Sequence, residues 1–231
     1  MTQFKLKLSS KNDIDLRSIL FFERLGEEDY TRLGAGWQRE GAQPQDFKTR
    51  IAFVNREPTL TRLSLDEIKL RAPDLIEVQP GRLVPPAAVR LVRPVSEEQK
   101  MQMAQAYPQQ AEAIAAKEIR FEYALPDADG DPVIKHYPAS IKTLREARVN
   151  LVNIGGERYV FAANITGVGK LDEQALSELR GAYSLASNQG TQIQTIHGPL
   201  IGTVPPHAIR QRAGLKTAPP SGGEAPKVEN P

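Results

Sequence analysis

The sequence has 231 residues, 40% of them apolar, which is enough for one large domain or two small ones with a buried core. It contains no cysteine, so disulfides, thiolate metal sites and cysteine nucleophiles are excluded. The net charge of +2 is too small to indicate nucleic-acid binding by itself, and the middle of the chain is acidic, with 8 acidic and 4 basic side chains in residues 96–138.

The first residues, MTQFKLKL, alternate apolar and polar side chains and lack the continuous apolar core of a signal peptide. The longest apolar run, Ile19–Phe22, is far shorter than the roughly 20 residues that cross a bilayer. The lack of cysteine also fits a reducing compartment. We therefore expect a soluble cytoplasmic protein without a membrane partner.

Residues 1–95 are predicted to be β-rich, because short apolar segments alternate with turn residues. The expected strands are residues 4–8, 50–54, 75–78 and 88–92. A type II turn at residues 79–82, Gln-Pro-Gly-Arg, should join two strands, since proline and glycine occupy its central positions. Short helices are expected within residues 13–20 and 64–70, each opened by an aspartate or serine cap.

Residues 34–46 are expected to form a surface loop that contains Trp37, the only tryptophan of the chain. An aromatic side chain flanked by glycines in a loop can anchor a partner. Alternatively, Trp37 covers the core as a buried plug, which is the commoner position of tryptophan. Both interpretations stay open.

Residues 96–118 are predicted to form a connector helix. Ser96 and Gln99 make a capping box, and Pro108 should kink or split the helix near its middle. A narrow apolar stripe runs along the helix and consists of Met101, Ala104, Tyr107, Ala111 and Ile114. The stripe either packs on the chain's own domain or binds a partner protein, in which case Met101, Tyr107 and Ile114 are the candidate contacts.

Residues 119–213 are predicted to form an α+β region. Strands are expected at residues 119–125, 133–137, 149–154, 157–165, 191–196 and 200–204, and helices at 140–144, 171–186 and 207–212. Strands and helices do not alternate regularly, so the fold is predicted to be α+β with mostly antiparallel sheets.

Gly155 and Gly156 separate two β-rich segments, which indicates a hairpin because both residues can adopt positive φ. The expected pairing sets Val152 opposite Tyr159 on one face and further apolar residues on the other. Because apolar groups then occupy both faces, we expect the hairpin to be central in its sheet.

Residues 214–231 are rich in proline and glycine and are expected to form a disordered tail, since they cannot bury enough apolar surface to order themselves. No internal repeat of useful period is visible, which argues against a solenoid or a propeller. The predicted organisation is a β-rich region 1–95, a Pro-kinked connector 96–118, an α+β region 119–213 built on a central hairpin, and the tail.

Residues 127–131, Asp-Ala-Asp-Gly-Asp, are the most chemistry-like stretch of the chain. A helix-loop-helix calcium site would need glycine at its sixth position and a carboxylate at its twelfth, where Pro132 and Pro138 stand. The composition is typical of a hairpin turn whose side-chain oxygens accept local backbone N–H groups. We favour this turn, with a weakly bound cation at the three aspartates as an alternative.

The fragment Asp127-Ala128-Asp129-Gly130 resembles, over four residues, the paired-aspartate signature of the haloacid-dehalogenase-like phosphatases. The resemblance implies a magnesium-dependent enzyme in which one carboxylate is the nucleophile and another the acid or base. Pro126 interrupts the preceding strand, and Asp131 stands where that family carries threonine or valine. A phosphatase-like enzyme at Asp127 and Asp129 is therefore only the third functional hypothesis.

Other catalytic patterns are incomplete. Residues 166–170, TGVGK, are expected to be a glycine-rich connection into a helix, because a Walker A loop would need other residues than Asn164 and Leu171 beside them. The three histidines are far apart in the sequence and have no metal-ligand spacing. We therefore assign no catalytic residue, metal ligand or cofactor, and expect a non-catalytic protein.

Two functional hypotheses remain. The first is a cytoplasmic binding or adaptor protein, such as an accessory protein of a bacterium, plasmid or phage, whose partner is another protein. The alternative is a weak nucleic-acid-binding protein that contacts phosphates through basic residues of two C-terminal segments. These candidates are Lys142, Arg145, Arg148, Arg210, Arg212 and Lys216.

Overall fold

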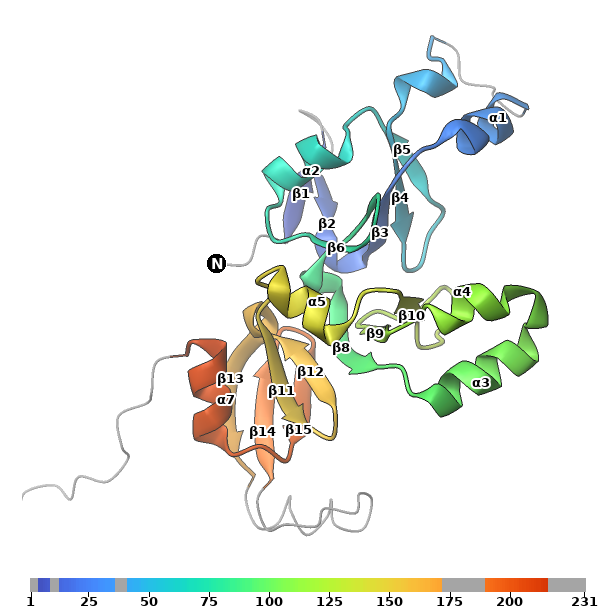
Figure 1. The fold of residues 1–231 in the computed structure, drawn as a ribbon. Coiled ribbons are helices and arrows are strands. Elements are labelled where there is room, and N and C mark those ends of the chain that lie inside the picture. Colours follow the sequence, from blue (N-terminus) through green and yellow to red (C-terminus); the bar gives the residue numbers. More distant parts are fainter. Residues whose placement is uncertain (1–3, 9–12, 36–40, 172–189, 216–231) are drawn as a thin grey trace, which may run out of the picture.

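The computed structural model describes residues 4–8, 13–35, 41–171 and 190–215 (Figure 1). These residues form a mixed α+β fold built on antiparallel sheets, which confirms the predicted fold class. Two of the sheets have five strands each, one has three, and a two-stranded sheet precedes them.

The first five-stranded sheet has the strand order β5-β4-β3-β7-β6. Its strands are β3 (Ile19–Arg24), β4 (Thr49–Phe53), β5 (Thr59–Thr61), β6 (Ile76–Gln79) and β7 (Arg82–Val84), and its helices are α1 (Glu27–Ala35) and α2 (Leu65–Arg71). Ser64 and Glu67 form a capping box at the start of α2, which confirms that helix. Gly81 has φ of 76° in the turn between β6 and β7, as the Pro-Gly sequence predicts.

The second five-stranded sheet has the order β10-β9-β8-β12-β11. Its strands are β8 (Val89–Pro94), β9 (Ile119–Tyr123), β10 (Ile134–Tyr137), β11 (Leu151–Gly155) and β12 (Arg158–Phe161), and its helices are α3 (Glu97–Ala106), α4 (Ala111–Ala115) and α5 (Ile141–Glu146). The 3-10 turn η4 (Pro108–Gln110) separates α3 from α4, which confirms that Pro108 splits the predicted helix.

The third sheet has the order β13-β14-β15. Its strands are β13 (Ile165–Lys170), β14 (Thr191–Thr195) and β15 (Gly198–Gly202), followed by α7 (Pro206–Ala213), and the N-terminal pair is β1 (Lys5–Lys7) with β2 (Asp13–Asp15). The predicted phosphate-loop-like stretch 166–170 is part of β13, so its interpretation as a connection into a helix is wrong. The predicted helix 171–186 and the tail from residue 216 lie outside the described residues.

The two large sheets repeat the same arrangement. In each, the first strand in sequence is central, and its neighbours follow in the same relative order. Each of β3, β8 and β13 follows a hairpin and a short 3-10 turn, and each has a register irregularity after its first residue. We call the units that begin with these strands repeats 1, 2 and 3; they start at Ile19, Val89 and Ile165. This repeat lies in the strand pairing and not in residue identity, so it is not visible as a sequence repeat.

The 3-10 turns are η1 (Leu16–Ser18), η3 (Pro86–Ala88) and η5 (Ala162–Asn164). The Asp15 side chain caps η1 by accepting a hydrogen bond from the Arg17 N–H group. The predicted helix 13–20 is wrong beyond this cap, because the apolar residues that follow it pair with two neighbouring strands and form β3. Tertiary strand pairing overrides the local capping signal here.

Three clusters of buried residues form a core that runs through all repeats. The middle cluster contains Val84 of repeat 1 together with Phe121 and Phe161 of repeat 2. The Tyr123 hydroxyl lies 2.8 Å from the Tyr137 hydroxyl and donates to the Leu20 carbonyl of repeat 1, also at 2.8 Å. The predicted boundary at residue 95 falls directly after β8, the central strand of the second sheet. The division of the chain into these regions stays a prediction.

The hairpin β11–β12 is not central in its sheet. Strand β11 is the edge strand, and Val152 pairs with Val160 and not with Tyr159, one residue away from the predicted register. Both of its faces are nevertheless buried, because β15 and α7 of repeat 3 pack beside β11. The close packing is visible at Gly155, where an added Cβ would lie 1.9 Å from Thr203 Oγ1.

Candidate functional site

None of the helices in the described part of the chain is both long enough and apolar enough to span a membrane. Within residues 4–8, 13–35, 41–171 and 190–215, no group of three or more histidine, aspartate or glutamate side chains could hold a metal ion. Two surfaces of the described residues stand out by their geometry: a helical arm and a row of arginines.

Helices α3 and α4 form an arm, residues 97–115, that projects sideways from the two large sheets (Figure 1). Ser96 starts α3 with a capping box, and Lys100 Nζ lies 2.9 Å from Glu97 and 3.1 Å from Glu118. None of the residues of α3 is buried. The arm is therefore held by its cap, its ion pairs and the packing of α4, and only one side of α3, which includes Lys100, Met103 and Ala104, is partly buried.

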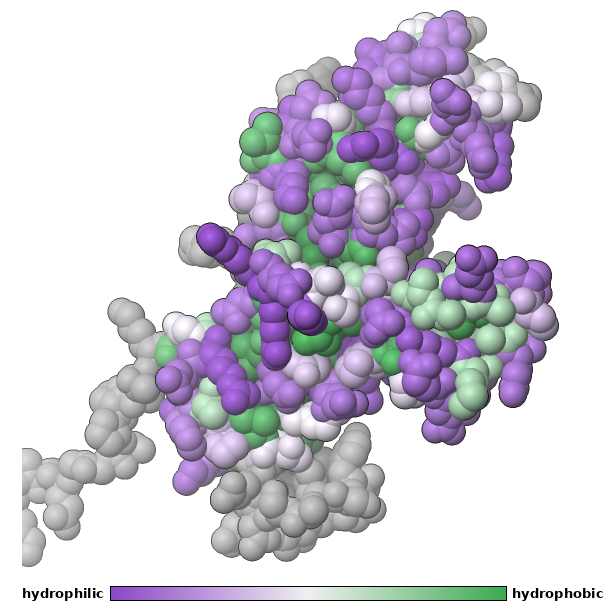
Figure 2. Space-filling model, in the orientation of Figure 1, coloured by the Kyte–Doolittle hydropathy of each residue, from purple (hydrophilic) through white to green (hydrophobic). Residues whose placement is uncertain are grey.

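The partner-binding residues predicted from the sequence differ in how far their side chains are exposed. Met101 is 60% exposed and Tyr107 is 55% exposed, whereas Ile114 is 7% exposed and packs inside the chain. Figure 2 shows pale green, moderately hydrophobic residues gathered on the arm. Trp37 lies outside the described residues. The arm therefore presents two of the four predicted side chains, and Ile114 anchors α4.

The predicted nucleic-acid-binding residues are divided between α5 and α7. Arg145 lies 5.5 Å over the Tyr159 ring, and Lys142 lies 3.9 Å from Glu146. Arg210 donates two hydrogen bonds to the Val168 carbonyl, so it fastens α7 to β13.

The ends of these two segments meet at Asn150, whose side chain donates to the Arg212 carbonyl at 3.3 Å. Arg148, with φ of 60°, lines a cleft of about 450 Å³ between repeats 1 and 2, beside Lys69, Asp74 and Glu77. The cleft thus carries both signs of charge. Lys216 lies outside the described residues.

A row of side chains crosses the first large sheet at one level of the strands. In the pairing register, Glu23 of β3 stands opposite Arg50 of β4 and Arg82 of β7. Each of its two carboxylate oxygens binds one of these arginines. The Arg82 guanidinium also lies 4.4 Å from the centre of the Phe21 ring. Repeat 1 thus holds one carboxylate between two arginines.

The same level of the second sheet carries a different row. Arg93 of β8 stands opposite Arg120 of β9, which in turn stands opposite His136 of β10. On the other side, the antiparallel pair Tyr159–Val92 places Arg158 of β12 opposite Arg93. We call His136, Arg120, Arg93 and Arg158 the arginine row.

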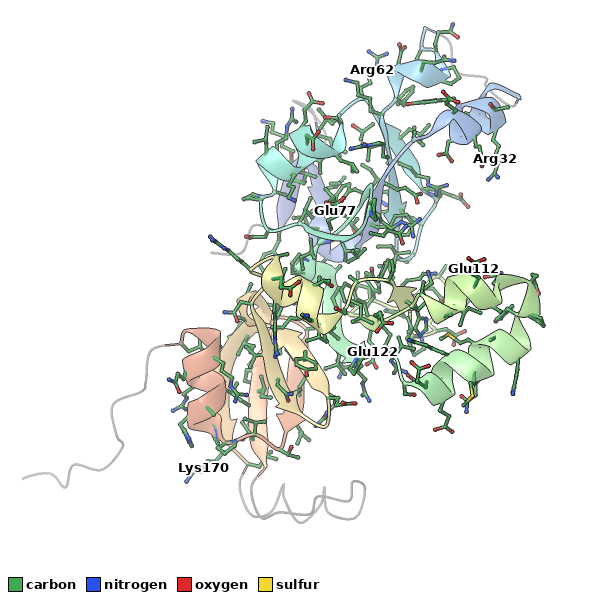
Figure 3. The ribbon with its side chains drawn as sticks, in the orientation of Figure 1. Arg32, Arg62, Glu77, Glu112, Glu122 and Lys170 are labelled. Carbon is green, nitrogen blue, oxygen red and sulfur yellow. The ribbon has the colours of Figure 1, made fainter. Side chains whose placement is uncertain are left out.

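Two arginines of this row share the carboxylate of Glu122, and Arg158 Nε donates to the Gly155 carbonyl at 3.1 Å. Glu122 Oε1 lies 2.6 Å from Arg120 Nη2 and 3.3 Å from Arg93 Nε (Glu122 is labelled in Figure 3). The pKa of His136 is lowered, first by its burial and then by the positive charges of Arg120 and Lys117. The positive charges of Arg120 and Lys117 thus act on His136.

Sequence reasoning missed the arginine row, because its members are 16 to 65 residues apart and only the strand register brings them together. The available signal was the alternation in β9, Ile-Arg-Phe-Glu-Tyr, which places Arg120 and Glu122 on the face opposite to the buried Phe121. That alternation indicates which face of β9 is polar, but not which residues of the neighbouring strands lie beside it.

The aspartate stretch forms the predicted turn. Asp127 Oδ1 accepts hydrogen bonds from the Asp129 N–H group at 3.0 Å and from the Asp131 N–H group at 2.9 Å. Gly130 has φ of 91°, a conformation that favours glycine. The Asp127 side chain is engaged in the turn, and the described residues contain no group of side chains that could hold a metal ion. Neither observation supports the phosphatase-like hypothesis.

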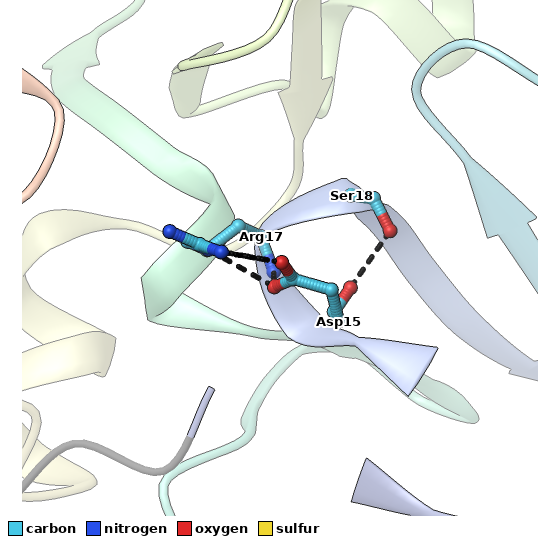
Figure 4. A network of polar contacts seen from close by, with 3 residues as sticks. All are labelled: Asp15, Arg17 and Ser18. Carbon is cyan, nitrogen blue, oxygen red and sulfur yellow. Dashed lines mark hydrogen bonds and ion pairs between the residues drawn. The ribbon is translucent and has the colours of Figure 1, made fainter. Parts of the chain in front are cut away.

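A polar junction joins the start of repeat 1 to the hairpin of repeat 3. Arg17 Nη2 lies 2.6 Å from Asp15 Oδ2, and Ser18 Oγ donates to the Asp15 carbonyl (Figure 4). This bond with Arg17 is the main reason that the pKa of Asp15 is lowered. His197 lines a cleft together with Asp15 and Arg17, and burial, followed by the charges of Arg17 and Arg90, lowers its pKa to about 4. The imidazole is thus neutral at physiological pH and belongs to a structural junction.

No protein-family model, curated protein or solved structure matches this chain. Function must therefore be inferred from the two surfaces themselves.

Proposed function

We propose that the protein is a non-catalytic adaptor that binds another protein through the α3–α4 arm. The observation that carries this proposal is that six of the ten residues of α3 are exposed and none is fully buried. Isolated helices of this length are marginal in water, so a helix kept exposed by a cap and ion pairs is well suited to gain its remaining stabilisation from a partner.

The chemistry of the arm indicates the kind of partner. The described arm carries Glu97, Glu98 and Glu112 but only one basic residue, Lys100, which is already paired. Glu112 points outward from α4 in Figure 3. Met101 and Tyr107 provide exposed apolar surface between these charges. We therefore infer a partner whose surface has a small apolar patch bordered by lysine or arginine.

We place this function in the cytoplasm, where a chain without cysteine loses nothing to the reducing conditions. An accessory role in a bacterium, plasmid or phage agrees with a small binding protein but rests on composition alone.

The test is a binding experiment with Met101→Glu/Tyr107→Glu. We expect the wild type to capture a specific protein in the presence of nuclease, and the double variant to lose at least tenfold in affinity for that purified protein, because two apolar contacts become charged. Leu70→Glu is the matched control, since Leu70 is 83% exposed on α2, away from the arm.

Two results would contradict the proposal. The first is equal affinity of the double variant and Leu70→Glu for the partner, with both variants folded. The second is a wild-type oligomer in sedimentation that the double variant dissociates, because the arm would then join copies of this chain.

A further inference from the structure

We propose that copies of this chain join head to tail, with the hairpin β1–β2 of one copy adding to the edge of β13 in another. The contact is separate from the α3–α4 arm. It rests on a comparison of the repeats. Both large sheets contain a hairpin, whereas the sheet of repeat 3 has three strands and the hairpin β1–β2 belongs to no larger sheet in the described residues.

Repeat 3 follows the other two repeats as far as its short helix. In each repeat a central strand is followed by two strands that lie beside it in order, β3-β4-β5, β8-β9-β10 and β13-β14-β15. A short helix comes next, and its fourth residue is fully buried in every case: Ile68 in α2, Leu144 in α5 and Ile209 in α7. Repeats 1 and 2 then continue with a hairpin, which the described part of repeat 3 lacks.

The second strand of that hairpin pairs with the central strand. In repeat 1, Leu83 of β7 stands opposite Phe22 of β3, and in repeat 2, Tyr159 of β12 stands opposite Val92 of β8. Counted from the register irregularity at the start of each central strand, Val168 of β13 is the residue equivalent to Phe22 and Val92. Val168 is therefore the residue of repeat 3 that a hairpin strand would face.

The edge of β13 at Val168 is held by a side chain instead of a strand. Val168 pairs with Ile193 of β14, and the described residues place no strand on the other side of β13. Arg210 of α7 donates two hydrogen bonds to the Val168 carbonyl. An edge strand whose backbone groups are not paired in a sheet is a template on which another strand can add.

The hairpin β1–β2 has the features of the strand pair that repeat 3 lacks. Like β6–β7 and β11–β12, it leads through a 3-10 turn into a central strand. Asp13 of β2 lies three residues before its 3-10 turn, as Leu83 and Tyr159 do before theirs. Asp13 is exposed, and β2 pairs only with β1 in the part of the chain that the structure describes. The side of β2 that would face a central strand is thus open.

A groove of about 600 Å³ beside β2 marks the place of a preceding repeat. Its lining includes Asp13, Ile14 and Phe53. Phe53 pairs with the first residue of β3, just as Tyr123 pairs with the first residue of β8. The Tyr123 hydroxyl donates to the carbonyl of Leu20 in the preceding repeat. The groove at Phe53 therefore corresponds to a position that, at Tyr123, the central strand of the preceding repeat fills.

The charges of the two surfaces are complementary. Arg210 is the fifth residue of α7, as Arg145 is the fifth residue of α5, and Arg145 lies 5.5 Å over the ring of Tyr159. Pairing β2 with β13 in the register of repeat 2 places Asp13 where Tyr159 stands, next to Arg210. The guanidinium group then turns from the Val168 carbonyl to the Asp13 carboxylate, and this ion pair fixes the register of the two strands.

The contact uses two different surfaces, so it does not end with two copies. The hairpin β1–β2 and strand β13 lie on opposite sides of repeat 2, and one copy cannot join its own two surfaces (Figure 1). Each added copy brings a further free hairpin or a further free β13 edge. Head-to-tail contacts of this kind continue until they close a ring or extend into a filament.

The experiment is sedimentation velocity of the full chain between about 1 μM and about 1 mM, which covers weak to moderate dissociation constants. We expect the wild type to form larger species as its concentration rises. Asp13→Arg should weaken this association at least tenfold, because two arginines then face each other at the contact. Asp74→Arg makes the same charge change at an exposed aspartate outside both surfaces and is the matched control.

A mixture of two variants tests the pairing directly. Arg210→Asp should also assemble poorly, since it faces Asp13 with a second carboxylate. Mixing it with Asp13→Arg restores an opposite-charge pair at every contact, so the mixture should assemble like the wild type. Circular dichroism checks that both variants are folded. If Arg210→Asp does not fold, the comparison of Asp13→Arg with Asp74→Arg decides alone.

Three results would overturn the proposal. They are a wild-type monomer at every concentration, equal assembly of folded Asp13→Arg and wild type, and a mixture of folded variants that stays monomeric. Assembly only after removal of residues 216–231 would assign the edge of β13 to that segment and would equally contradict it. Met101→Glu/Tyr107→Glu should assemble like the wild type, which separates this contact from the proposed adaptor function.

Discussion

Repeats 1 and 2 have the same strand order and the same register in their large sheets, but they place opposite charges at different positions along the strands. Repeat 1 places Glu23 between Arg50 and Arg82, and each of its carboxylate oxygens binds one of the two arginines. Repeat 2 places Arg93 at that position and moves the carboxylate to Glu122. The central position of the row is thus acidic in repeat 1 and basic in repeat 2.

The largest effect is expected when repeat 1 is given the arrangement of repeat 2. Glu23→Arg should lower the free energy of unfolding by about 3–5 kcal/mol, because three partly buried arginines would then be adjacent without an anion. Urea denaturation measures this loss. Adding Ala52→Glu supplies the counterpart of Glu122 and should recover part of it.

Glu112→Gln is the control for Glu23→Arg, because Glu112 is exposed on α4 and its loss should change stability by less than about 0.5 kcal/mol. A Glu23→Arg variant as stable as the wild type would show that the row of repeat 1 does not depend on its central carboxylate. The contrast between the two repeats would then have no energetic basis.

A second contrast lies in the hairpins at the ends of the two rows. Gly81 and Gly155 both have positive φ, but an added Cβ at Gly81 meets only Arg24 Cβ at 3.6 Å, whereas at Gly155 it meets Thr203 Oγ1 at 1.9 Å. Gly155→Ala should therefore cost about 2–4 kcal/mol of stability, and Gly81→Ala about 1 kcal/mol.

Thermal and urea unfolding of both alanine variants check this order. Thr203→Ala should reduce the cost of Gly155→Ala, because it removes the closest atom, Oγ1, and leaves the Cβ at 3.1 Å. Equal losses of stability in Gly155→Ala and Gly81→Ala would mean that repeat 3 does not pack against β11 as closely as the structure indicates.

The difference between local contacts and contacts between repeats explains which features the sequence could predict. Local signals were sufficient for the capped helices at Ser64 and Ser96, for the split at Pro108 and for the Asp127 turn, because each depends on atoms a few residues apart. The edge position of β11 could not be predicted, since its second buried face is supplied by β15 and α7 from another repeat.

The two candidate surfaces also differ in how far the sequence could predict them. The exposure of Met101 and Tyr107 follows from a helix rich in glutamine, alanine and glutamate, so the apolar stripe was visible, although Ile114 turned inward. Arg93, Arg120 and Arg158 each look like an ordinary polar residue of an alternating strand. Only the register, which depends on the whole sheet, converts them into one row.

The smallest expected effect tests the electrostatics of the row directly. The pKa of His136 in the folded protein is lowered by burial, Arg120 and Lys117, so Arg120→Gln should raise it by removing a nearby positive charge. Histidine chemical shifts followed by NMR between pH 5 and 8 report this pKa. Arg50→Gln, the equivalent substitution in repeat 1, is the control and should leave the pKa of His136 unchanged.

The same shift makes a signed prediction for stability. Because the folded-state pKa of His136 lies below its unfolded value of 6.5, the unfolded chain binds more protons below that pH, and the contribution of this residue is full above pH 6.5 and lost as the pH falls. In Arg120→Gln the folded and unfolded pKa values are closer, so this residue's share of the pH dependence shrinks. A His136 pKa that does not respond to Arg120→Gln would mean that Arg120 contributes little positive potential at His136.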